Sequence, residues 1–144
     1  MLIMICVLSI TLLLKTSSDP VYVDDLAELV DDKTDIWDLE ELENNNNVAR
    51  WLKFRILWRI LLRQSPDVKF KYRMKITERK RFHDEFIEER INRARDPRVK
   101  EFWNEVQKLD TDLTISESDA FEREFQMLSQ LAPDQRKLIG RLCR

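Results

Sequence analysis

The sequence predicts an all-α protein, a single compact bundle of six to seven helices that follows a cleaved signal peptide. Apolar residues recur at helical spacing throughout residues 19–144, and no stretch alternates with period two for long. Glycine occurs once and proline four times, while 36% of the residues are charged, a composition that favours helices. At 144 residues the chain has room for one domain.

The chain opens with an apolar segment that is too short to cross a bilayer. The run 2–14 holds thirteen residues, whereas a spanning helix needs about 20. The small residues Thr16 and Ser18 follow it, as in a secretory signal with its cleavage site. We therefore expect residues 1–18 to be removed and residues 19–144 to be secreted as one helical domain. An uncleaved anchor is the alternative, because no Lys or Arg precedes the apolar run.

The acidic segment 22–43 is expected to form two short helices, since it carries two short apolar stripes. Thr34 is expected to start the second of them, because a Thr side chain can accept from exposed backbone N–H groups. The asparagine run 44–47 breaks the periodicity and predicts a loop.

The segment 48–64 predicts a helix that ends before proline and is apolar around most of its circumference. Its two tryptophans fall on one broad face, and three arginines at intervals of four form a narrow stripe opposite. A membrane-surface helix usually keeps a wide polar face, so the pattern favours a central core helix. A lipid-binding helix and a helix that docks in a partner's groove are the alternatives. The candidates for a core or interaction role are Trp51, Trp58, Arg55, Arg59 and Arg63.

The rest of the chain predicts further helices with recognisable starting residues. Residues 67–95 form either one long helix or two, with Thr77 as the internal cap in the second case. Asp96, which is followed by proline, caps the next helix. After a loop, Ser116 or Ser118 caps another. No repeat of fixed period is visible.

Charge is divided into an acidic block and a basic block, although the net charge of the whole chain is only −2. Residues 22–43 hold ten Asp or Glu and one Lys, a net charge of −9. Residues 50–81 hold twelve Lys or Arg against two acidic residues, a net charge of +10. Because opposite charges lower each other's self-repulsion, we expect the first block to pack beside the second.

Aromatic residues on the apolar stripes predict a large aromatic interior. Its expected members are Trp37, Trp51, Trp58, Trp103, Phe54, Phe102, Phe121 and Phe125. Ligand cavities in helical proteins are lined by such residues, and so is any tightly packed core.

The sequence contains no catalytic signature, so we expect neither an enzyme nor a bound organic cofactor. One glycine, Gly140, is too few for a phosphate loop, a nucleophile elbow or a dinucleotide fingerprint. His83 is the only histidine, and a zinc site would need at least two more good ligands. Nucleic acid is not an expected partner, because the acidic block would repel phosphate and no known docking motif is present.

The stretch "DTDLTISESDAF" partly matches a calcium-binding loop. Asp110 and Asp112 stand where the first and third positions of an EF-hand would be. The required glycine is replaced by Ile115 and the bidentate glutamate by Phe121, so this is not an EF-hand. A looser Ca²⁺ or Mg²⁺ site built from Asp110, Asp112 and the Ser116 hydroxyl is the remaining candidate, against a simple capped loop.

Cys143 is the only cysteine expected in the mature chain, one residue from its end. A lone cysteine on a terminal segment is consistent with a disulfide-linked homodimer. An ordinary exposed thiol explains it equally well.

The forty residues "KEFWNEVQKLDTDLTISESDAFEREFQMLSQLAPDQRKLI" resemble the last helices of the nematode SXP-type secreted antigens, which are also described as a cation-binding domain. In those proteins a helix ends in a polar loop with Asp, and a second helix and a Leu-Pro-like step follow. The resemblance implies a secreted, non-enzymatic helical protein that binds divalent cations or apolar ligands.

Together these observations predict a secreted, non-enzymatic binding protein. Its ligand would be a divalent cation, a small apolar molecule or another protein. The alternative is a membrane-active or precursor protein whose acidic segment 22–43 masks the cationic amphipathic helix 48–64. In the precursor version, the basic run "RKR" at residues 79–81 would be the cleavage site.

Overall fold

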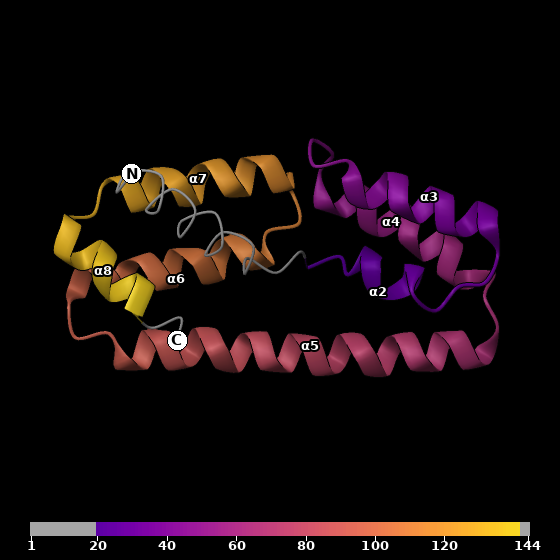
Figure 1. Ribbon diagram of the computed structural model, residues 1–144, viewed down its shortest axis with the longest axis horizontal. Helices are drawn as coiled ribbons and strands as arrows, with labels where there is room; N and C mark the ends of the chain where they lie inside the picture. Colours follow the sequence, from indigo (N-terminus) through magenta and orange to yellow (C-terminus); the bar gives the residue numbers. More distant parts are fainter. Residues whose placement is uncertain (1–19, 142–144) are drawn as a thin grey trace, which may run out of the picture.

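The computed structural model describes residues 20–141, and these residues form seven helices and no strand (Figure 1). The helices are α2 (Val23–Ala27), α3 (Lys33–Asn44), α4 (Arg50–Leu62), α5 (Pro66–Arg93), α6 (Pro97–Thr111), α7 (Glu117–Ser129) and α8 (Pro133–Arg141). The prediction of an all-α protein with six to seven helices is confirmed.

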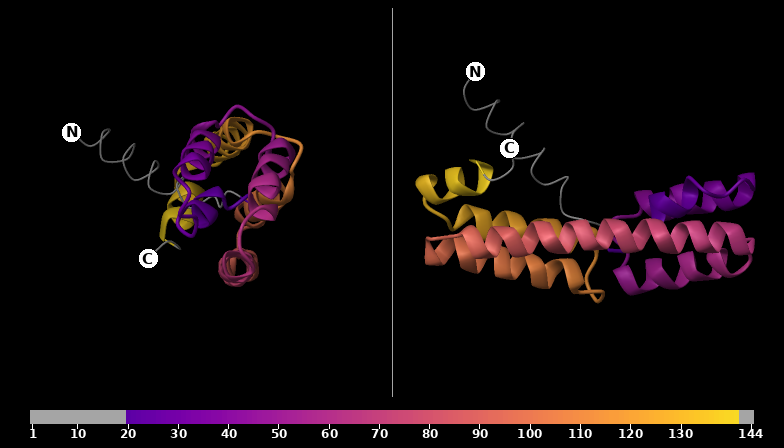
Figure 2. Two further views of the ribbon diagram at one scale, coloured as in Figure 1. Left: turned by 90° about the vertical axis from the view of Figure 1, so that its right-hand side faces the viewer. Right: turned by 90° about the horizontal axis from the view of Figure 1, so that it is seen from below.

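The longest helix, α5, has 28 residues and is shared by two halves of the molecule. Figures 1 and 2 show α2, α3 and α4 along its N-terminal part, and α6, α7 and α8 along its C-terminal part. Each half has its own cluster of buried apolar side chains, to which α5 contributes Tyr72 in the first half and Ile87 in the second. The expectation that the bundle is wrapped around helix 48–64 is wrong, because the shared element is α5.

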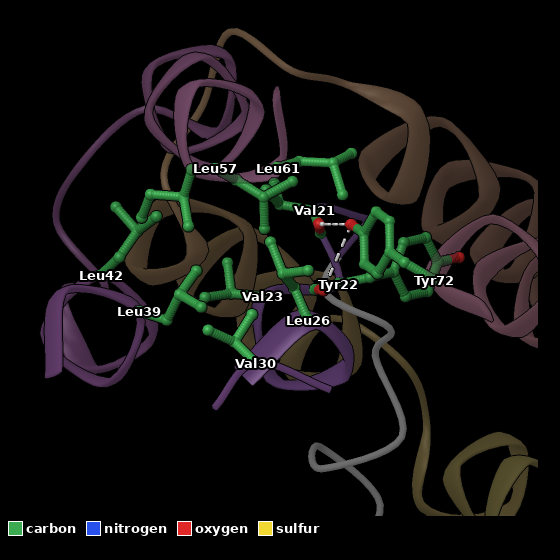
Figure 3. Close-up of a cluster of buried hydrophobic side chains, with 11 residues drawn as sticks. Val21, Tyr22, Val23, Leu26, Val30, Leu39, Leu42, Leu57, Leu61 and Tyr72 are labelled. Atoms are coloured by element: carbon green, nitrogen blue, oxygen red, sulfur yellow. Dashed lines mark hydrogen bonds between the residues drawn. The ribbon is translucent and has the colours of Figure 1, made fainter. Parts of the chain in front are cut away.

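The apolar cluster of the first half joins α2, α3, α4 and α5 (Figure 3). Leu26 and Leu39 are fully buried in it, and Leu57 of α4 is buried in the same cluster. Burial of one such side chain contributes about 2 kcal/mol. The hydroxyl of Tyr72 donates to the carbonyl oxygens of Val21 and Tyr22, at 3.3 and 3.4 Å. These hydrogen bonds attach the start of the described chain to α5.

Two of the predicted helix starts lie elsewhere in the structure. The cap of α3 is Asp32, whose carboxylate accepts from the backbone N–H of Thr34 at 2.9 Å, so Thr34 is inside the helix. Thr77 is not a cap either, because α5 is one continuous helix that starts after Ser65. The Thr77 hydroxyl instead donates to the Arg73 carbonyl at 2.8 Å within the helix.

Two other starts agree with the sequence. Asp96 caps α6 by accepting from two backbone N–H groups, and a proline occupies the first turn. Ser116 caps α7 in a reciprocal arrangement, in which Asp119 accepts from the Ser116 backbone N–H at 3.1 Å. Such a capping box satisfies N–H groups that the first turn of a helix leaves unpaired.

The two halves repeat one plan, although no repeat is visible in the residue pattern. Helices α4 and α7 have 13 residues each, and their first residues, Arg50 and Glu117, lie 67 positions apart. The same interval separates Pro66 from Pro133, which begin α5 and α8. Each half therefore contains a helix, a short loop, a 13-residue helix and a helix that begins with proline.

The loops that precede α4 and α7 pair with each other across the centre of the molecule. Ala49 and Ser116, which are equivalent in the repeat, form an isolated antiparallel bridge. The Trp51 N–H donates to the Leu113 carbonyl at 2.8 Å, and the equivalent N–H of Ser118 donates to the carbonyl of Asn46 at 2.9 Å. This exchange between equivalent positions relates the loops by an approximate two-fold axis.

Arg50 connects the same two loops through its side chain, which is fully buried. Its guanidinium forms a bidentate pair with Glu117 and donates to the carbonyl oxygens of Leu109 and Asp112, the latter at 3.1 Å. The two carbonyls lie at the C-terminal end of α6, where a cation is favoured by the helix dipole. Arg50 thus joins α4, α6 and α7.

The acidic block packs beside the basic block, as the charge pattern predicted. Asp25, which is 1% exposed, lies 3.1 Å from the Lys75 ammonium and also pairs with Arg79. Asp35 of α3 pairs with Arg63 at the end of α4, and this hydrogen bond lowers the pKa of Asp35. These pairs attach α2 and α3 to the basic helices.

Some predictions concern residues outside the described part of the chain. The signal sequence 1–18 and Cys143 both lie there, so secretion and a disulfide-linked dimer stay predictions. Within residues 20–141, no helix is both long enough and apolar enough to cross a membrane.

Replacing Arg50 tests how much the junction between the halves stabilises the fold. We expect Arg50→Met to lower the free energy of unfolding by about 3–5 kcal/mol, because it leaves Glu117 and two carbonyls without their donor. Urea unfolding at neutral pH measures the change. The control is Arg59→Met on the exposed side of α4, which should stay within about 0.5 kcal/mol of the parent. Equal effects of the two substitutions would contradict a structural role for Arg50.

Candidate functional site

Helix α4 presents most of its aromatic side chains to solvent. Trp51, Phe54 and Trp58 are 50%, 46% and 49% exposed. The prediction that the two tryptophans lie in the core is therefore wrong, and their role as interaction residues remains the candidate. Trp37, Phe121 and Phe125, also predicted to be internal, are exposed as well, whereas Phe102 and Trp103 are buried.

The orientation of α4 follows from two buried cations, Arg50 and Lys53. The buried side of the helix carries Arg50, Lys53 and Leu57, each at most 1% exposed. Arg50 pairs with Glu117 of the second half. The Lys53 ammonium donates to the Glu43 carbonyl at 3.2 Å, near the end of α3. Because both cations must face the interior, the face with Trp51 and Trp58 is turned partly outward.

An apolar groove runs between α4 and the first part of α5. It has a volume of about 320 Å³. Its lining residues are Phe54, Leu57, Trp58, Leu61, Leu62, Lys69, Tyr72, Arg73 and Ile76. The rings of Phe54 and Trp58 stack with their centroids 6.1 Å apart and an interplanar angle of 19°. The groove therefore has an aromatic wall on α4, and its wall on α5 combines Tyr72, Ile76 and two basic side chains.

Cations border this groove on both sides. On α5, the Lys69 ammonium donates to the Leu62 carbonyl at 2.7 Å, and Arg73 is exposed beside it. On α4, Arg55 is exposed next to the tryptophan face. The region around the aromatic wall therefore carries positive charge.

The three arginines predicted to form one stripe have different surroundings. Arg63 pairs with Asp35 and lies 3.7 Å from Asp38. Arg59 lines a separate cleft between α3 and α4 that Asp38 also lines. Arg55 forms no ion pair among the described residues. It follows Trp51 by four residues and precedes Trp58 by three, so it lies beside the tryptophans and not opposite them as predicted.

The proposed cation ligands do not converge on one point. Asp112 accepts from the backbone N–H and the hydroxyl of Thr114, at 2.9 and 2.6 Å. The Ser116 hydroxyl donates to Asp119 at 2.8 Å, and Asp110 lies 2.7 Å from His83. Within residues 20–141, no three His, Cys, Asp or Glu side chains are grouped so that they could hold a metal ion. The loop is better described by its capping hydrogen bonds.

A partly buried acidic cluster lies at the junction of α5, α6 and α7, and sequence reasoning missed it. His83 Nε2 of α5 contacts Asp110 Oδ2 of α6. Burial, together with the negative charge of Asp110, raises the pKa of Glu124 on α7 to about 7. In the repeat, Glu124 takes the position of the buried Leu57, which explains why this carboxyl group faces the interior.

Comparison of the chain with family models, with curated proteins and with solved structures finds no match.

The Glu124 carboxyl makes stability depend on pH. Its pKa in the folded protein, about 7, exceeds its ordinary value of 4.5, so its contribution is complete below pH 4.5 and lost as pH rises through 7. This shift corresponds to at most about 3 kcal/mol. We expect Glu124→Gln to raise the free energy of unfolding at pH 8 and to change it little at pH 4.5, measured by urea unfolding at both values. A gain of the same size at both values would contradict this account.

Proposed function

We propose that this protein is a non-enzymatic binding protein whose binding site is the groove between α4 and α5. The observation that carries the proposal is the stacked, half-exposed pair Phe54 and Trp58 on the groove wall. Large aromatic side chains exposed together mark interaction surfaces, because leaving them in water forgoes the stabilisation of burial. Tryptophan and arginine are also the residues that contribute most at interfaces.

The dimensions of the groove support this proposal. Its volume of about 320 Å³ lies near the lower end of the range for ligand sites, and most of its lining is apolar. Apolar side chains of a ligand would displace water from Phe54, Trp58 and Leu62, while Lys69 and Arg73 would meet polar groups at the edge. Secretion is part of the proposal and is supported by the apolar run 2–14 with the small residues after it.

The membrane-active alternative has less support. The acidic residues of α2 and α3 pair with Arg63, Lys75 and Arg79, which leaves the tryptophan face of α4 uncovered. The acidic segment thus pairs with the end of α4 at Arg63 and leaves its tryptophan face open to solvent. The buried side of α4 also contributes Leu57 to the core, so release of the helix would cost stability.

Binding of the apolar anionic dye ANS (anilinonaphthalene sulfonate) tests the site. We expect Trp58→Ala to weaken dye binding at least about tenfold, because the dye loses its aromatic wall. The matched control is Phe125→Ala, which removes the equivalent exposed ring in the second half. Dye fluorescence measures affinity, and far-UV circular dichroism checks that both variants are folded. Equal affinity in both variants would overturn the proposal.

A further inference from the structure

The groove between α4 and α5 is bordered by a straight line of exposed apolar side chains. These side chains belong to Trp51, Phe54, Trp58 and Leu62, which are 46–57% exposed. Their spacing of three, four and four residues places them along one side of α4 over about 16 Å. A surface of this length, beside a groove between two helices, matches the contact made by about three turns of a helix.

The charges around this line are positive and uncompensated by nearby acids. Arg55 and Arg73 are exposed, and neither forms an ion pair within the described chain. Several acidic residues of the first half pair with other cations, for example Asp25 with Lys75 and Asp67 with Lys71 at 2.7 Å. A ligand with carboxylates at its edges would therefore be favoured over a neutral or basic ligand.

Resting on the proposed function, we propose that this groove binds an acidic amphipathic helix of another protein. The apolar anchors of that helix lie on Phe54 and Trp58, and its flanking carboxylates pair with the cations at the two edges. Anchors at every third and fourth position fit the exposed line on α4, and carboxylates beside them meet Arg55 on one edge and Arg73 on the other.

A second copy of this chain offers a poorer fit. Its acidic helix α3 exposes one large apolar side chain, Trp37 at 62%. Its helix α7, which has acidic residues in its first turn, exposes two, Phe121 at 48% and Phe125 at 51%. One or two anchors leave part of the exposed line of four side chains on α4 uncovered. A partner helix with several anchors covers it.

Binding of labelled synthetic helical peptides, measured by fluorescence anisotropy, tests the proposal. One peptide carries leucines at every third and fourth position and flanking glutamates, and its match carries lysines in place of the glutamates. We expect the acidic peptide to bind at least about tenfold more tightly, because two or three exposed ion pairs together supply that difference. Added salt should reduce the preference. Trp58→Ala should weaken the binding of both peptides.

Charge reversal provides the sharper test of the partner's chemistry. We expect Arg55→Glu with Arg73→Glu to abolish or invert the preference for the acidic peptide while dye binding to the groove persists. The matched control, Arg59→Glu, lies in the separate cleft against α3 and should leave the preference unchanged. Equal affinity for both peptides, with dye binding still sensitive to Trp58→Ala, would overturn this inference and leave the proposed function intact. Loss of that sensitivity would overturn both.

Two further measurements identify other occupants. Phosphatidylglycerol vesicles that bind the protein more tightly than the acidic peptide, in a manner lost with Trp58→Ala, would overturn the inference in favour of a membrane surface. Self-association that is abolished by Trp37→Ala or by Phe121→Ala would overturn it in favour of a second copy. A protein that stays monomeric and does not bind the vesicles supports an acidic amphipathic helix as the partner.

Discussion

The contact between Arg50 and the loop before α7 is the constraint on which the rest of the structure depends. A fully buried guanidinium is tolerated only when its donors are used, and here they reach Glu117 and the carbonyls at the end of α6. The bridge between Ala49 and Ser116 adds backbone hydrogen bonds at the same place. The two halves are thus held together at this junction and by the continuous helix α5.

This junction also determines which surface of α4 meets solvent. With Arg50 and Lys53 turned inward, the helix buries Leu57 and leaves Trp51 and Trp58 half exposed. The aromatic wall of the groove is therefore a consequence of how the halves are joined. The acidic residues of α2 and α3 pair with Arg63, Lys75 and Arg79, which lie away from the tryptophan face. The positive charge beside the aromatic wall is therefore left unpaired.

Local features of the sequence predicted much of the fold. The helical content, the caps at Asp96 and Ser116 and the packing of acidic beside basic segments all follow from residues close in sequence or from summed charge. The orientation of α4 did not, because the buried Arg50 meets groups 59 to 67 positions away, which no periodicity reveals. The repeat could not be recognised in the residue pattern, because equivalent positions such as Leu57 and Glu124 share a place in the fold and differ in chemistry.

Acrylamide quenching of fluorescence tests whether the tryptophan face of α4 is a solvent-exposed surface. One variant retains Trp51 and Trp58 after Trp37→Phe and Trp103→Phe, and a second retains only the buried Trp103. We expect the first variant to be quenched several-fold more strongly than the second. Circular dichroism checks that both variants are folded. Equally weak quenching in the two variants would place the α4 indoles in the interior and contradict a solvent-exposed tryptophan face.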